Sequence, residues 1–364
     1  MKNISVIGIG RLGLCLSLVL EKAGYSIVGC DIDKAYVEKI NNKSFNSHEA
    51  NVNTFLKESQ NFHTTTNLAN TIKHGDLIFV TVRTDSEPDG KYDHSQVESV
   101  VNSIIDLGEQ KERKHLVLNC NVNPGYSDIV GNKLKEFNWD VSYNPETIAQ
   151  GTIINDYLSP DCVYIGTRTD ELADQIESVY KTMCNNDPKV HKMDRLSAEL
   201  TKVSLNCFLT TKISFANMVG DLATQMGADP EKILSAVGSD SRIGTKYFKY
   251  GFGYGGPCFP RDNRAFIKCA TDNKMPADLC KSSDNINRKH LDFQVKQFMK
   301  NWDIRKPVRI KSVTYKEGTT ILEESQQLAY ALRLAESGYK VIIKESEEVT
   351  RQLKENFGDL FEYE

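Results

Sequence analysis

Short apolar runs separated by helical patterns organise the first half of the chain. The runs expected to be strands are residues 4–7, 27–30, 77–82, 116–120, 141–143 and 162–165. Apolar residues at helical spacing follow the first run, and residues 93–107 have the pattern of a further helix. Strands that alternate with helices are typical of a parallel sheet covered on both faces, so residues 1–190 are predicted to form a doubly wound, Rossmann-like α/β domain.

The pattern changes after residue 190. Residues 195–226 contain no proline, and their apolar residues recur at helical spacing, which predicts a long helix suited to a spine or a dimer interface. A further helix is predicted to begin at Pro230, with Asp229 as its N-cap. The last segment is expected to contain a strand, a helix ended by Gly338 and a second strand, at residues 308–313, 323–337 and 340–343.

These patterns predict three domains and several connections. The domains are residues 1–190, a central helical dimerisation domain at 191–300, and a short C-terminal Rossmann-like α/β domain at 301–364. Because the third piece is small, it must dock on the rest of the chain. We expect a loop with a short helix at residues 42–61, a mobile loop at 86–92 and a plain connection at 151–160.

A glycine motif directly follows the first predicted strand. It reads Gly8-Ile9-Gly10-Arg11-Leu12-Gly13, and Asp31 ends the second strand. Glycines there permit a tight turn and let backbone N–H groups approach a pyrophosphate. The carboxylate of Asp31 would accept hydrogen bonds from a ribose diol and repel a 2′-phosphate, which favours NAD over NADP. The alternative is a glycine-rich turn that binds nothing.

Composition excludes several classes of function. The net charge of -4 and the pI of about 6.0 give no basic face for nucleic acid. The sequence contains no apolar run long enough to cross a bilayer and no signal peptide, so a cytoplasmic protein without a membrane partner is expected. Nine scattered cysteines without a C-x-x-C pair indicate reduced thiols and no metal site.

One cysteine stands apart from the others. Residues 251–262 read G-F-G-Y-G-G-P-C-F-P-R-D, so the thiol of Cys258 lies on a loop stiffened by Pro257 and Pro260, just before Arg261 and Asp262. A nearby cation lowers the pKa of a thiol, so Cys258 is a candidate nucleophile. A tight surface loop with a buried structural cysteine is the competing interpretation.

Other polar residues stand where parallel strands end or share a helix face. Thr84, Asn121 and Glu146 follow predicted strands, at the edge of the sheet where ligands bind. Lys202 and Asn206 are four residues apart on the long helix and share one face, from which they are suited to stabilise an oxyanion. Each of these residues also has an ordinary interpretation as a loop or surface group.

Taken in order, these motifs resemble the UDP-glucose/GDP-mannose dehydrogenase family along nearly the whole chain. The motifs are the glycine motif, Asn144-Pro145-Glu146, Lys-Val-Ser-Leu-Asn at 202–206, Ser-Arg-Ile-Gly at 241–244 and the cysteine loop at 251–262. The resemblance implies that the C6 alcohol of a nucleotide sugar is oxidised to a carboxylate while two NAD⁺ are reduced. Cys258 matches the nucleophile that captures the aldehyde as a thiohemiacetal.

The resemblance also assigns roles to the other candidates. Lys202 and Asn206 match the pair that stabilises the oxyanion, and Glu146 and Asp262 match carboxylates that act on water. The residues expected to contact NAD are Gly8, Ile9, Gly10, Arg11, Leu12, Gly13, Asp31, Thr84, Asn121, Glu146 and Arg261. Those expected to contact the nucleotide sugar are Glu146, Ile148, Lys202, Asn206, Arg242, Tyr247, Gly255 and Cys258.

Arg242 matches an arginine that reaches the substrate of a neighbouring subunit, which implies a homodimer, and the third domain would hold the nucleotide. UDP-glucose is the expected substrate and UDP-glucuronate, a precursor of polysaccharides, the expected product. GDP-mannose and a UDP-N-acetylhexosamine are alternative substrates.

Some positions depart from the family pattern. Asn121 replaces a threonine that orients the catalytic water, and Asn123 also departs from the usual sequence before Gly125. Arg83 and Asp85 replace prolines, and residues 147–150 differ from the usual sequence. Two other classes of protein stay open. A two-electron β-hydroxyacid-type dehydrogenase needs neither Cys258 nor a third domain, and a non-catalytic NAD-sensing scaffold would tolerate these departures.

Overall fold

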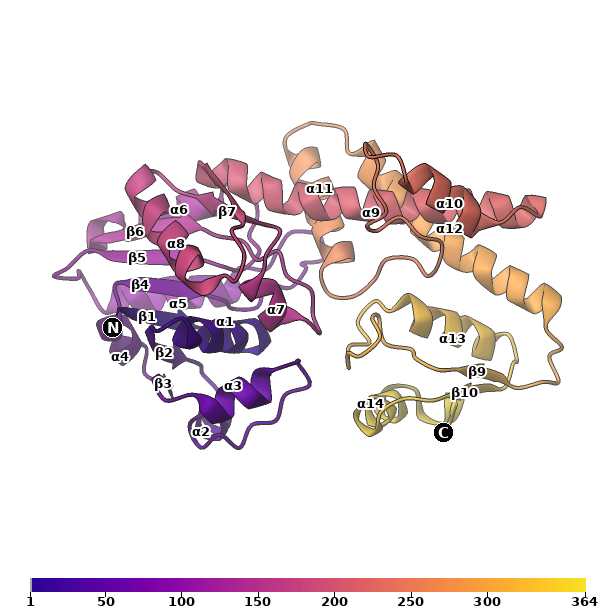
Figure 1. Cartoon of the computed structure of the whole chain (residues 1–364), viewed down its shortest axis with the longest axis horizontal. Helices are drawn as coiled ribbons and strands as arrows, with labels where there is room; N and C mark the ends of the chain where they lie inside the picture. Colours follow the sequence, from indigo (N-terminus) through magenta and orange to yellow (C-terminus); the bar gives the residue numbers. More distant parts are fainter. Residues whose placement is uncertain (1) are drawn as a thin grey trace. The chain divides into compact units, whose positions relative to one another are not determined.

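The computed structural model describes residues 2–364, which form two compact units, one ending at Lys202 and the other beginning at Val203. In the first unit, the described residues form one sheet of eight strands, drawn from indigo to magenta in Figure 1. The strands are β1 (Asn3–Ile7), β2 (Ser26–Cys30), β3 (Phe62–Thr65), β4 (Leu77–Val80), β5 (Lys114–Leu118), β6 (Trp139–Tyr143), β7 (Cys162–Gly166) and β8 (Lys189–Met193).

The strand order is β3-β2-β1-β4-β5-β6-β7-β8, and all but one of the neighbouring pairs are parallel. The exception is β6 with β7, which meet in antiparallel direction at a single pair, Tyr143 with Gly166. The predicted doubly wound α/β domain is therefore confirmed. These two strands run in opposite directions because the chain between them stays at one end of the sheet. The pattern of apolar residues does not show at which end a connection finishes, so the sequence did not reveal this change.

Helices cover both faces of this sheet. They are α1 (Arg11–Lys22), α2 (Lys34–Asn41), α3 (Val52–Glu58), α4 (Leu68–His74), α5 (Ser95–Asp106), α6 (Tyr126–Leu134), α7 (Ile153–Leu158) and α8 (Asp170–Met183), with a 3₁₀ turn at Lys135–Phe137. Because side chains alternate along a strand, Ile4 and Val6 pack with α1, α7 and α8, while Ile78 and Val80 pack with α5 and α6. The sheet thus has a hydrophobic core on each side.

Three connections predicted from the sequence have different outcomes. Residues 42–61 contain the short helix α3, as predicted. Residues 151–160 were expected to be a plain connection. This was wrong, because α7 forms there and buries Ile153 and Ile154 in the hydrophobic core that contains Ile4 and Val6, the first core. The ends of the segment 86–92 form an isolated bridge between Ser86 and Tyr92, and Tyr92 is buried.

A single helix of 32 residues, α9 (Arg195–Met226), covers the long segment without proline. It contains the boundary between the two units. The helices that follow are α10 (Pro230–Gly238), α11 (Phe259–Asp272) and α12 (Asp278–Asn301). Asp229 caps α10 as predicted, because its carboxylate accepts the N–H groups of Glu231 and Lys232 at 3.0 and 3.2 Å.

The C-terminal segment forms a small parallel sheet with the order β11-β10-β9. Its elements are β9 (Val308–Ile310), α13 (Gln326–Glu336), β10 (Val341–Ile343), α14 (Glu347–Phe357), a 3₁₀ turn at Gly358–Leu360 and β11 (Glu362–Tyr363). Leu291 and Val295 of α12 belong to the same hydrophobic core as this sheet. The segment therefore completes its core with α12, within the second unit (Figure 1).

Within residues 2–364, every helix is too short or too polar to cross a membrane. The nine cysteines are all free thiols, and burial raises the pKa of Cys15 and Cys30, as expected for core residues. In the described part of the chain, histidine, cysteine and acidic side chains do not gather in groups of three that would hold a metal ion.

Candidate active site

The loop between β1 and α1 is shaped by its glycines. Gly8 has a φ of +83°, which favours glycine, and a Cβ on Gly13 would lie only 2.0 Å from the carbonyl oxygen of Gly8. In contrast, nothing lies within 4 Å of the position that a Cβ on Gly10 would occupy. Gly10 is the N-cap of α1, so this open space lies where helix N–H groups bind phosphate. The geometry suits the predicted pyrophosphate site.

Asp31 is oriented by hydrogen bonds on both oxygens. The N–H of Ile9 donates to Oδ2 at 3.2 Å, and the N–H of Asp33 donates to Oδ1 at 3.1 Å. A carboxylate has more acceptor sites than these two bonds use, so capacity for a ribose diol is left. The next residue, Ile32, is 98% exposed, and sequence reasoning did not single it out. Its place directly after Asp31, at the end of the second strand, is the signal in the sequence that would have found it.

The loop after β4 is bound to the loop after β5 by Asn123, one of the residues that depart from the family pattern. Its amide accepts the N–H of Tyr92 and donates to the Tyr92 carbonyl, both at 3.1 Å. The N–H of Asn123 donates to Nε2 of His94 at 3.1 Å, and the His94 ring stacks on Tyr126. Burial lowers the pKa of His94 to about 4, which keeps Nε2 available as an acceptor.

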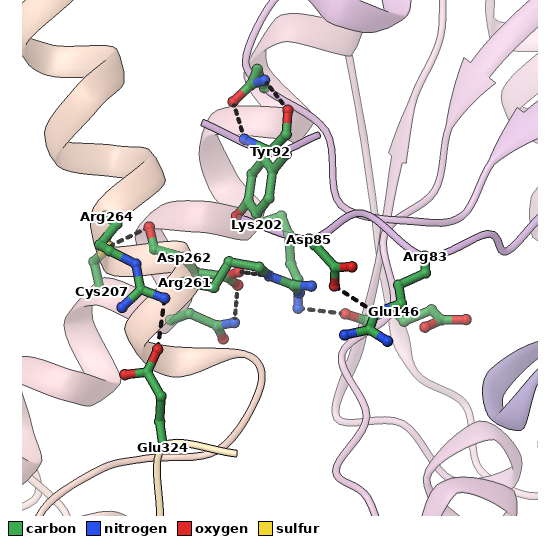
Figure 2. Close-up of polar contacts among 12 residues, drawn as sticks. Arg83, Asp85, Tyr92, Glu146, Lys202, Cys207, Arg261, Asp262, Arg264 and Glu324 are labelled. Carbon is green, nitrogen blue, oxygen red and sulfur yellow. Dashed lines mark hydrogen bonds and ion pairs between the residues drawn. The ribbon is translucent and has the colours of Figure 1, made fainter. Parts of the chain in front are cut away.

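Thr84 and Asn121, expected to face the cofactor, lie in these two loops. Thr84 is buried and Asn121 is half-buried. Arg83 and Asp85 flank Thr84 and pair with each other, with Nε and Oδ1 2.5 Å apart (Figure 2). Because both charged side chains are exposed, this ion pair contributes little to stability. The two substitutions for proline therefore place a matched pair of charges beside Thr84.

Glu146 lies just beyond the end of β6 and is half-buried. The hydroxyl group of Tyr157, on α7, donates a hydrogen bond to Oε1 of Glu146. The ammonium group of Lys202 donates to the backbone carbonyl of Glu146 at 2.7 Å, as Figure 2 shows. Burial raises the pKa of Glu146 to about 7, although the hydrogen bond from Tyr157 and the charge of Lys202 oppose the shift. Such a carboxyl group is suited to act as a base near neutral pH.

The loop that follows Glu146 contains the predicted substrate contact Ile148 and is bound from two sides. Nη1 of Arg11, in the glycine motif, donates to Oε1 of Gln150 at 2.7 Å. The N–H of Gly151 lies 2.9 Å from both carboxylate oxygens of Glu49. Glu49 is buried and was not a candidate in the sequence analysis. A glutamate in a segment rich in Asn and Ser carries no local signal of such a distant partner.

Cys258 is the N-cap residue of α11, in the second unit, and is half-buried. The N-terminus of a helix has partial positive charge, which favours an anionic group such as a thiolate. The glycines before Cys258 are required by close contacts. A Cβ on Gly255 would lie 2.2 Å from the carbonyl oxygen of Glu324, and one on Gly256 would lie 2.3 Å from the ring of Tyr315. The glycines therefore permit the close backbone contacts of this loop.

Asp262 lies one helical turn after Cys258 and is fully buried. Its carboxylate has a partner on each oxygen: Nδ2 of Asn206 donates to Oδ2 at 2.5 Å, and Nε of Arg261 donates to Oδ1 at 3.3 Å (Figure 2). These bonds provide the partners that a buried carboxylate needs. The same bonds orient the amide of Asn206 and direct the guanidinium of Arg261, which was predicted to contact the cofactor, toward Asp262.

The predicted substrate contacts Arg242 and Tyr247 lie in the connection between α10 and α11. Arg242 is exposed, and its guanidinium binds Asp240 in its own loop, with hydrogen bonds of 3.0 and 2.7 Å. Tyr247 has a φ of +59°, a left-handed conformation that is unusual for a residue other than glycine. Its ring lies edge-on to the ring of Phe259, the first residue of α11.

The structure thus groups the predicted residues within each unit. In the first unit, Lys202 binds the main chain at Glu146. In the second, Asn206 and Asp262 are hydrogen-bonded, and the N–H of Asp262 donates to the carbonyl of Cys258 at 2.8 Å. Lys202 and Asn206, predicted to share a helix face, are both buried on α9 but bind different partners. Each group combines a carboxyl group with a hydrogen-bond donor, as acid–base chemistry on a carbonyl compound requires.

Comparison with known families covers most of the chain. Residues 2–184 match the NAD binding domain of the UDP-glucose/GDP-mannose dehydrogenase family, and residues 196–289 match the central domain of that family. The resemblance predicted from the ordered motifs is therefore confirmed.

Named relatives agree with this match. The UDP-glucose 6-dehydrogenase of Rickettsia bellii is 28% identical over 344 residues, which cover 92% of this chain and 79% of the relative. UDP-glucose 6-dehydrogenase AglM of Haloferax volcanii is 26% identical over 372 residues, which cover 98% of this chain and 86% of the relative. Among solved structures, the UDP-glucose dehydrogenase of the archaeon Pyrobaculum islandicum superposes with a TM-score of 0.90 at 27% identity, over all of this chain and 86% of that one.

Proposed function

The chain belongs to the UDP-glucose/GDP-mannose dehydrogenase family of NAD-dependent oxidoreductases, and we propose that it oxidises UDP-glucose to UDP-glucuronate with the reduction of two NAD⁺. The observation that carries the proposal is the group around Cys258. This thiol stands at the N-terminus of α11, one turn from Asp262, whose buried carboxylate binds the amide of Asn206. A nucleophile, a carboxylate and an amide donor are the groups that a covalent oxidation of an aldehyde needs.

The residues present in the first unit fit a bound dinucleotide. The open space at Gly10 and the N–H groups of α1 would hold the pyrophosphate, and Asp31 would accept hydrogen bonds from the ribose diol. A 2′-phosphate would meet the charge of Asp31, so NAD is preferred to NADP. The exposed side chain of Ile32 would pack against the adenine ring. NAD, when bound, accepts a hydride from C6 in each of the two oxidations.

The chemistry on the protein is a sequence of bond changes at one carbon. The first oxidation removes a hydride from C6 and releases the hydroxyl proton to water, which leaves an aldehyde. The thiolate of Cys258 then attacks the aldehyde carbon to form a C–S bond and an oxyanion. Lys202 and Asn206 stabilise that oxyanion by donating hydrogen bonds. The second oxidation converts the thiohemiacetal into a thioester. Water then attacks the thioester carbon, the C–S bond breaks, and the carboxylate is released while Cys258 is regenerated.

Hydrolysis of the thioester needs a base for the attacking water, and Glu146 supports this role. Burial raises its pKa to about 7, so the carboxylate can take a proton from water near neutral pH. Tyr157 holds one of its oxygens. Asp262 orients Asn206 and is the second candidate to position water. Asn121, which replaces a threonine, would bind the water by its amide without relaying a proton.

UDP-glucose is favoured among the possible substrates. The relatives named above are UDP-glucose dehydrogenases, and the sequence Phe-Pro-Arg-Asp at 259–262 resembles the branches that oxidise glucose and mannose. Contacts with the sugar and its diphosphate are proposed for Ile148, Tyr247 and Gly255. GDP-mannose and a UDP-N-acetylhexosamine are the alternative substrates within the same chemistry.

We further propose a homodimer formed along α9. This helix exposes large apolar side chains, among them Phe208 at 62%, Leu222 at 61% and Met226 at 75%. Apolar side chains exposed along one helix mark a surface for association. Arg242 is exposed and would reach the substrate of the other subunit. A Leu222→Glu variant is expected to elute as a monomer in size-exclusion chromatography with light scattering, and a dimer of unchanged affinity would contradict the assignment.

The test of the function is a count of NADH. The protein is incubated with a limiting amount of each of four nucleotide sugars, namely UDP-glucose, UDP-galactose, GDP-mannose and UDP-N-acetylglucosamine, with excess NAD⁺. We expect two NADH per UDP-glucose and loss of activity after Cys258 is alkylated by iodoacetamide. A yield of one NADH would support a two-electron dehydrogenase, and NAD binding without turnover on any sugar would support a sensing scaffold.

A further inference from the structure

A buried histidine lies beneath the glycine loop (residues 251–256) that leads to Cys258. His290, on α12, is only 1% exposed. Its Nδ1 lies 2.9 Å from both carboxylate oxygens of Asp221, on α9, and its Nε2 lies 2.6 Å from the carbonyl oxygen of Gly251. His290 therefore connects the two long helices to the first residue of the glycine loop.

Both ring nitrogens of His290 have hydrogen-bond partners. Nδ1 faces the carboxylate of Asp221, and Nε2 faces the carbonyl oxygen of Gly251. The hydroxyl group of Tyr250 also donates to Asp221, at 2.9 Å, and Nε2 of Gln294 donates to the Gly251 carbonyl at 3.2 Å. The carbonyl of Gly251 thus has two donors from α12.

Two asparagines hold the rest of the loop backbone. The N–H of Gly251 donates to Oδ1 of Asn217, on α9, at 3.1 Å. Asn287, on α12, accepts the N–H of Tyr254 and donates to the Tyr254 carbonyl, each at 2.9 Å. A Cβ on Gly253 would lie 2.1 Å from Oδ1 of Asn287. Side chains of α9 and α12 therefore satisfy backbone groups that a strand or a helix would otherwise satisfy.

The glycine loop has little room to absorb a displacement before Cys258. Gly255 and Gly256 pack against Glu324 and Tyr315, as described above, and Pro257 follows with a restricted φ. The backbone next to the thiol is thus closely packed, and the contact of His290 with Gly251 fixes the start of the same short loop. Neither His290 nor Asp221 lies next to Cys258 in the sequence. His290 binds the carbonyl of Gly251, seven residues before the thiol, and Asp221 binds His290 and the hydroxyl group of Tyr250, the residue just before the loop.

We propose that Asp221 and His290 are positioning residues that set the place of Cys258 through the carbonyl of Gly251. The proposal rests on the assignment of Cys258 as the nucleophile. Asp221 orients the ring of His290, and His290 binds the loop. Neither residue would touch the reacting atoms. Their effect is on the thiol's position, to which covalent chemistry is sensitive because an error of about 1 Å can cost on the order of a hundredfold in rate.

Three substitutions and one control test this proposal. His290→Leu removes both donors, His290→Gln retains one N–H donor for Gly251, and Asp221→Asn retains an acceptor for Nδ1 while removing the charge. The control is Gln297→Ala, also on α12, whose side chain binds Gln225 and not the loop. Thermal unfolding and circular dichroism of each full-length protein establish that it is folded. The kinetic readouts are kcat and the KM for NAD⁺ with UDP-glucose.

We expect His290→Leu to lower kcat roughly tenfold to a hundredfold, with less than about a twofold change in the KM for NAD⁺. His290→Gln should stay within about threefold of the wild-type kcat, because it keeps a donor to Gly251, and Asp221→Asn should lie between the two. Rescue by glutamine separates positioning from a general loss of stability. A folded His290→Leu protein with the wild-type kcat would overturn the proposal, as would an equal loss in the leucine and glutamine variants.

A second readout needs no turnover. The rate at which iodoacetamide alkylates Cys258, measured by peptide mass spectrometry in the absence of substrate, should change severalfold in His290→Leu and stay near the wild-type rate in His290→Gln and Gln297→Ala. An unchanged rate in His290→Leu contradicts the positioning role. If the wild-type protein forms no NADH from any sugar, the proposed function fails, while the alkylation rates still test the contact between His290 and the glycine loop. If His290→Leu does not fold, Asp221→Asn and His290→Gln decide the question.

Discussion

The ammonium group of Lys202 donates a hydrogen bond to the backbone carbonyl of Glu146 at 2.7 Å, while the carboxyl group of Glu146 accepts a hydrogen bond from Tyr157. The lysine thus holds the main chain at the end of β6 and leaves the carboxyl group to its tyrosine partner. Burial then outweighs both favourable contacts and raises the pKa of Glu146 to about 7. This carboxyl group changes protonation state in the range where a base is useful.

The pH dependence of turnover follows from that pKa. Because the base must be ionised to accept a proton, NADH formation is expected to fall as the pH falls below about 7. At pH 6 about a tenth of the Glu146 carboxyl groups are ionised, so the rate should be about tenfold below its plateau. Steady-state rates between pH 5.5 and 8.5 check this, and a flat profile would contradict it. Glu146→Gln should have a low rate without this pH step.

Two tyrosine variants provide a matched control for this profile. Tyr157→Phe removes a hydrogen bond that lowers the pKa of Glu146, so the midpoint of the pH profile should move to higher pH. The hydroxyl group of Tyr180 donates to Asn144 instead, at 2.9 Å, so Tyr180→Phe should leave the midpoint unchanged. Equal shifts in the two variants would show that the profile does not report on Glu146.

The same pKa predicts how stability depends on pH. The ordinary pKa of a glutamate is 4.5, and that of Glu146 is raised to about 7 in the folded state. Between these values the folded protein binds a proton that the unfolded chain has lost, so this contribution to stability is full below pH 4.5 and is lost as the pH rises through 7. Glu146→Gln has no carboxyl group to ionise, so it does not lose this stability at high pH. Its Tm should exceed that of the wild type by a few degrees at pH 8. A lower Tm at pH 8 would oppose this assignment.

Replacement of Cys258 should separate the two oxidations. Cys258→Ser lacks a thiolate, so steady-state NADH formation is expected to fall on the order of a thousandfold while NAD binding is retained. Rapid mixing with limiting UDP-glucose should give at most one NADH per substrate on the time scale of the wild-type reaction. The control is Cys162→Ser, because Cys162 is also half-buried. Two NADH at the normal rate from Cys258→Ser would rule out the covalent route.

The hydrogen bond between Asn206 and Asp262 should contribute to stability as well as to activity. Asn206→Leu leaves one oxygen of a fully buried carboxylate without its amide, which should cost about 1–3 kcal/mol of unfolding free energy. Asn206→Asp places a second carboxylate beside Asp262 and should be more destabilising than Asn206→Leu. Urea unfolding measures both, with the exposed Ser204→Ala on the same helix as control. The reverse order of stability for the two variants would contradict the role given to this hydrogen bond.

Asp31 should determine the choice of dinucleotide. Asp31→Asn removes the charge while keeping an oxygen for the N–H of Ile9, so the KM for NAD⁺ should rise roughly tenfold and the preference over NADP⁺ should shrink. The control is Asp33→Asn, because Asp33 caps α2 and accepts the N–H of Tyr36 at 3.0 Å. If both variants keep the wild-type ratio of NAD⁺ to NADP⁺ use, another group selects the cofactor.

Much of the first unit was predictable because its signals are local. The run Ile4–Ile7, the glycine motif and Asp31 lie within one stretch of chain, and each constrains the backbone of its neighbours. The predicted helix at 195–226 has the bounds of α9 for the same reason, since apolar residues at helical spacing continue without a proline. Asp229 before Pro230 marked the start of α10, and its side chain caps that helix.

Other features depend on contacts that local patterns do not contain. Helix α7 is six residues long, and Ile153 and Ile154 stabilise it by packing against the first core. The hydrogen bonds from Gly151 to Glu49 join residues 102 positions apart. Likewise, Asn123 departs from the family pattern and makes two hydrogen bonds to the backbone of Tyr92. The sequence around either residue gives no sign of this contact.

By itself, the sequence determined most of the alternation of strands and helices in the first unit, the long helix α9, the glycine turn at the dinucleotide site and the thiol at position 258. It did so because backbone preference and side-chain chemistry belong to single residues and short segments. The tertiary structure decided the partners: Lys202 with the carbonyl of Glu146, Asn206 with Asp262, and His290 with Gly251. These pairs join residues tens of positions apart. They form only because packed helices bring donors within reach of buried acceptors, where an unpaired polar group would be costly.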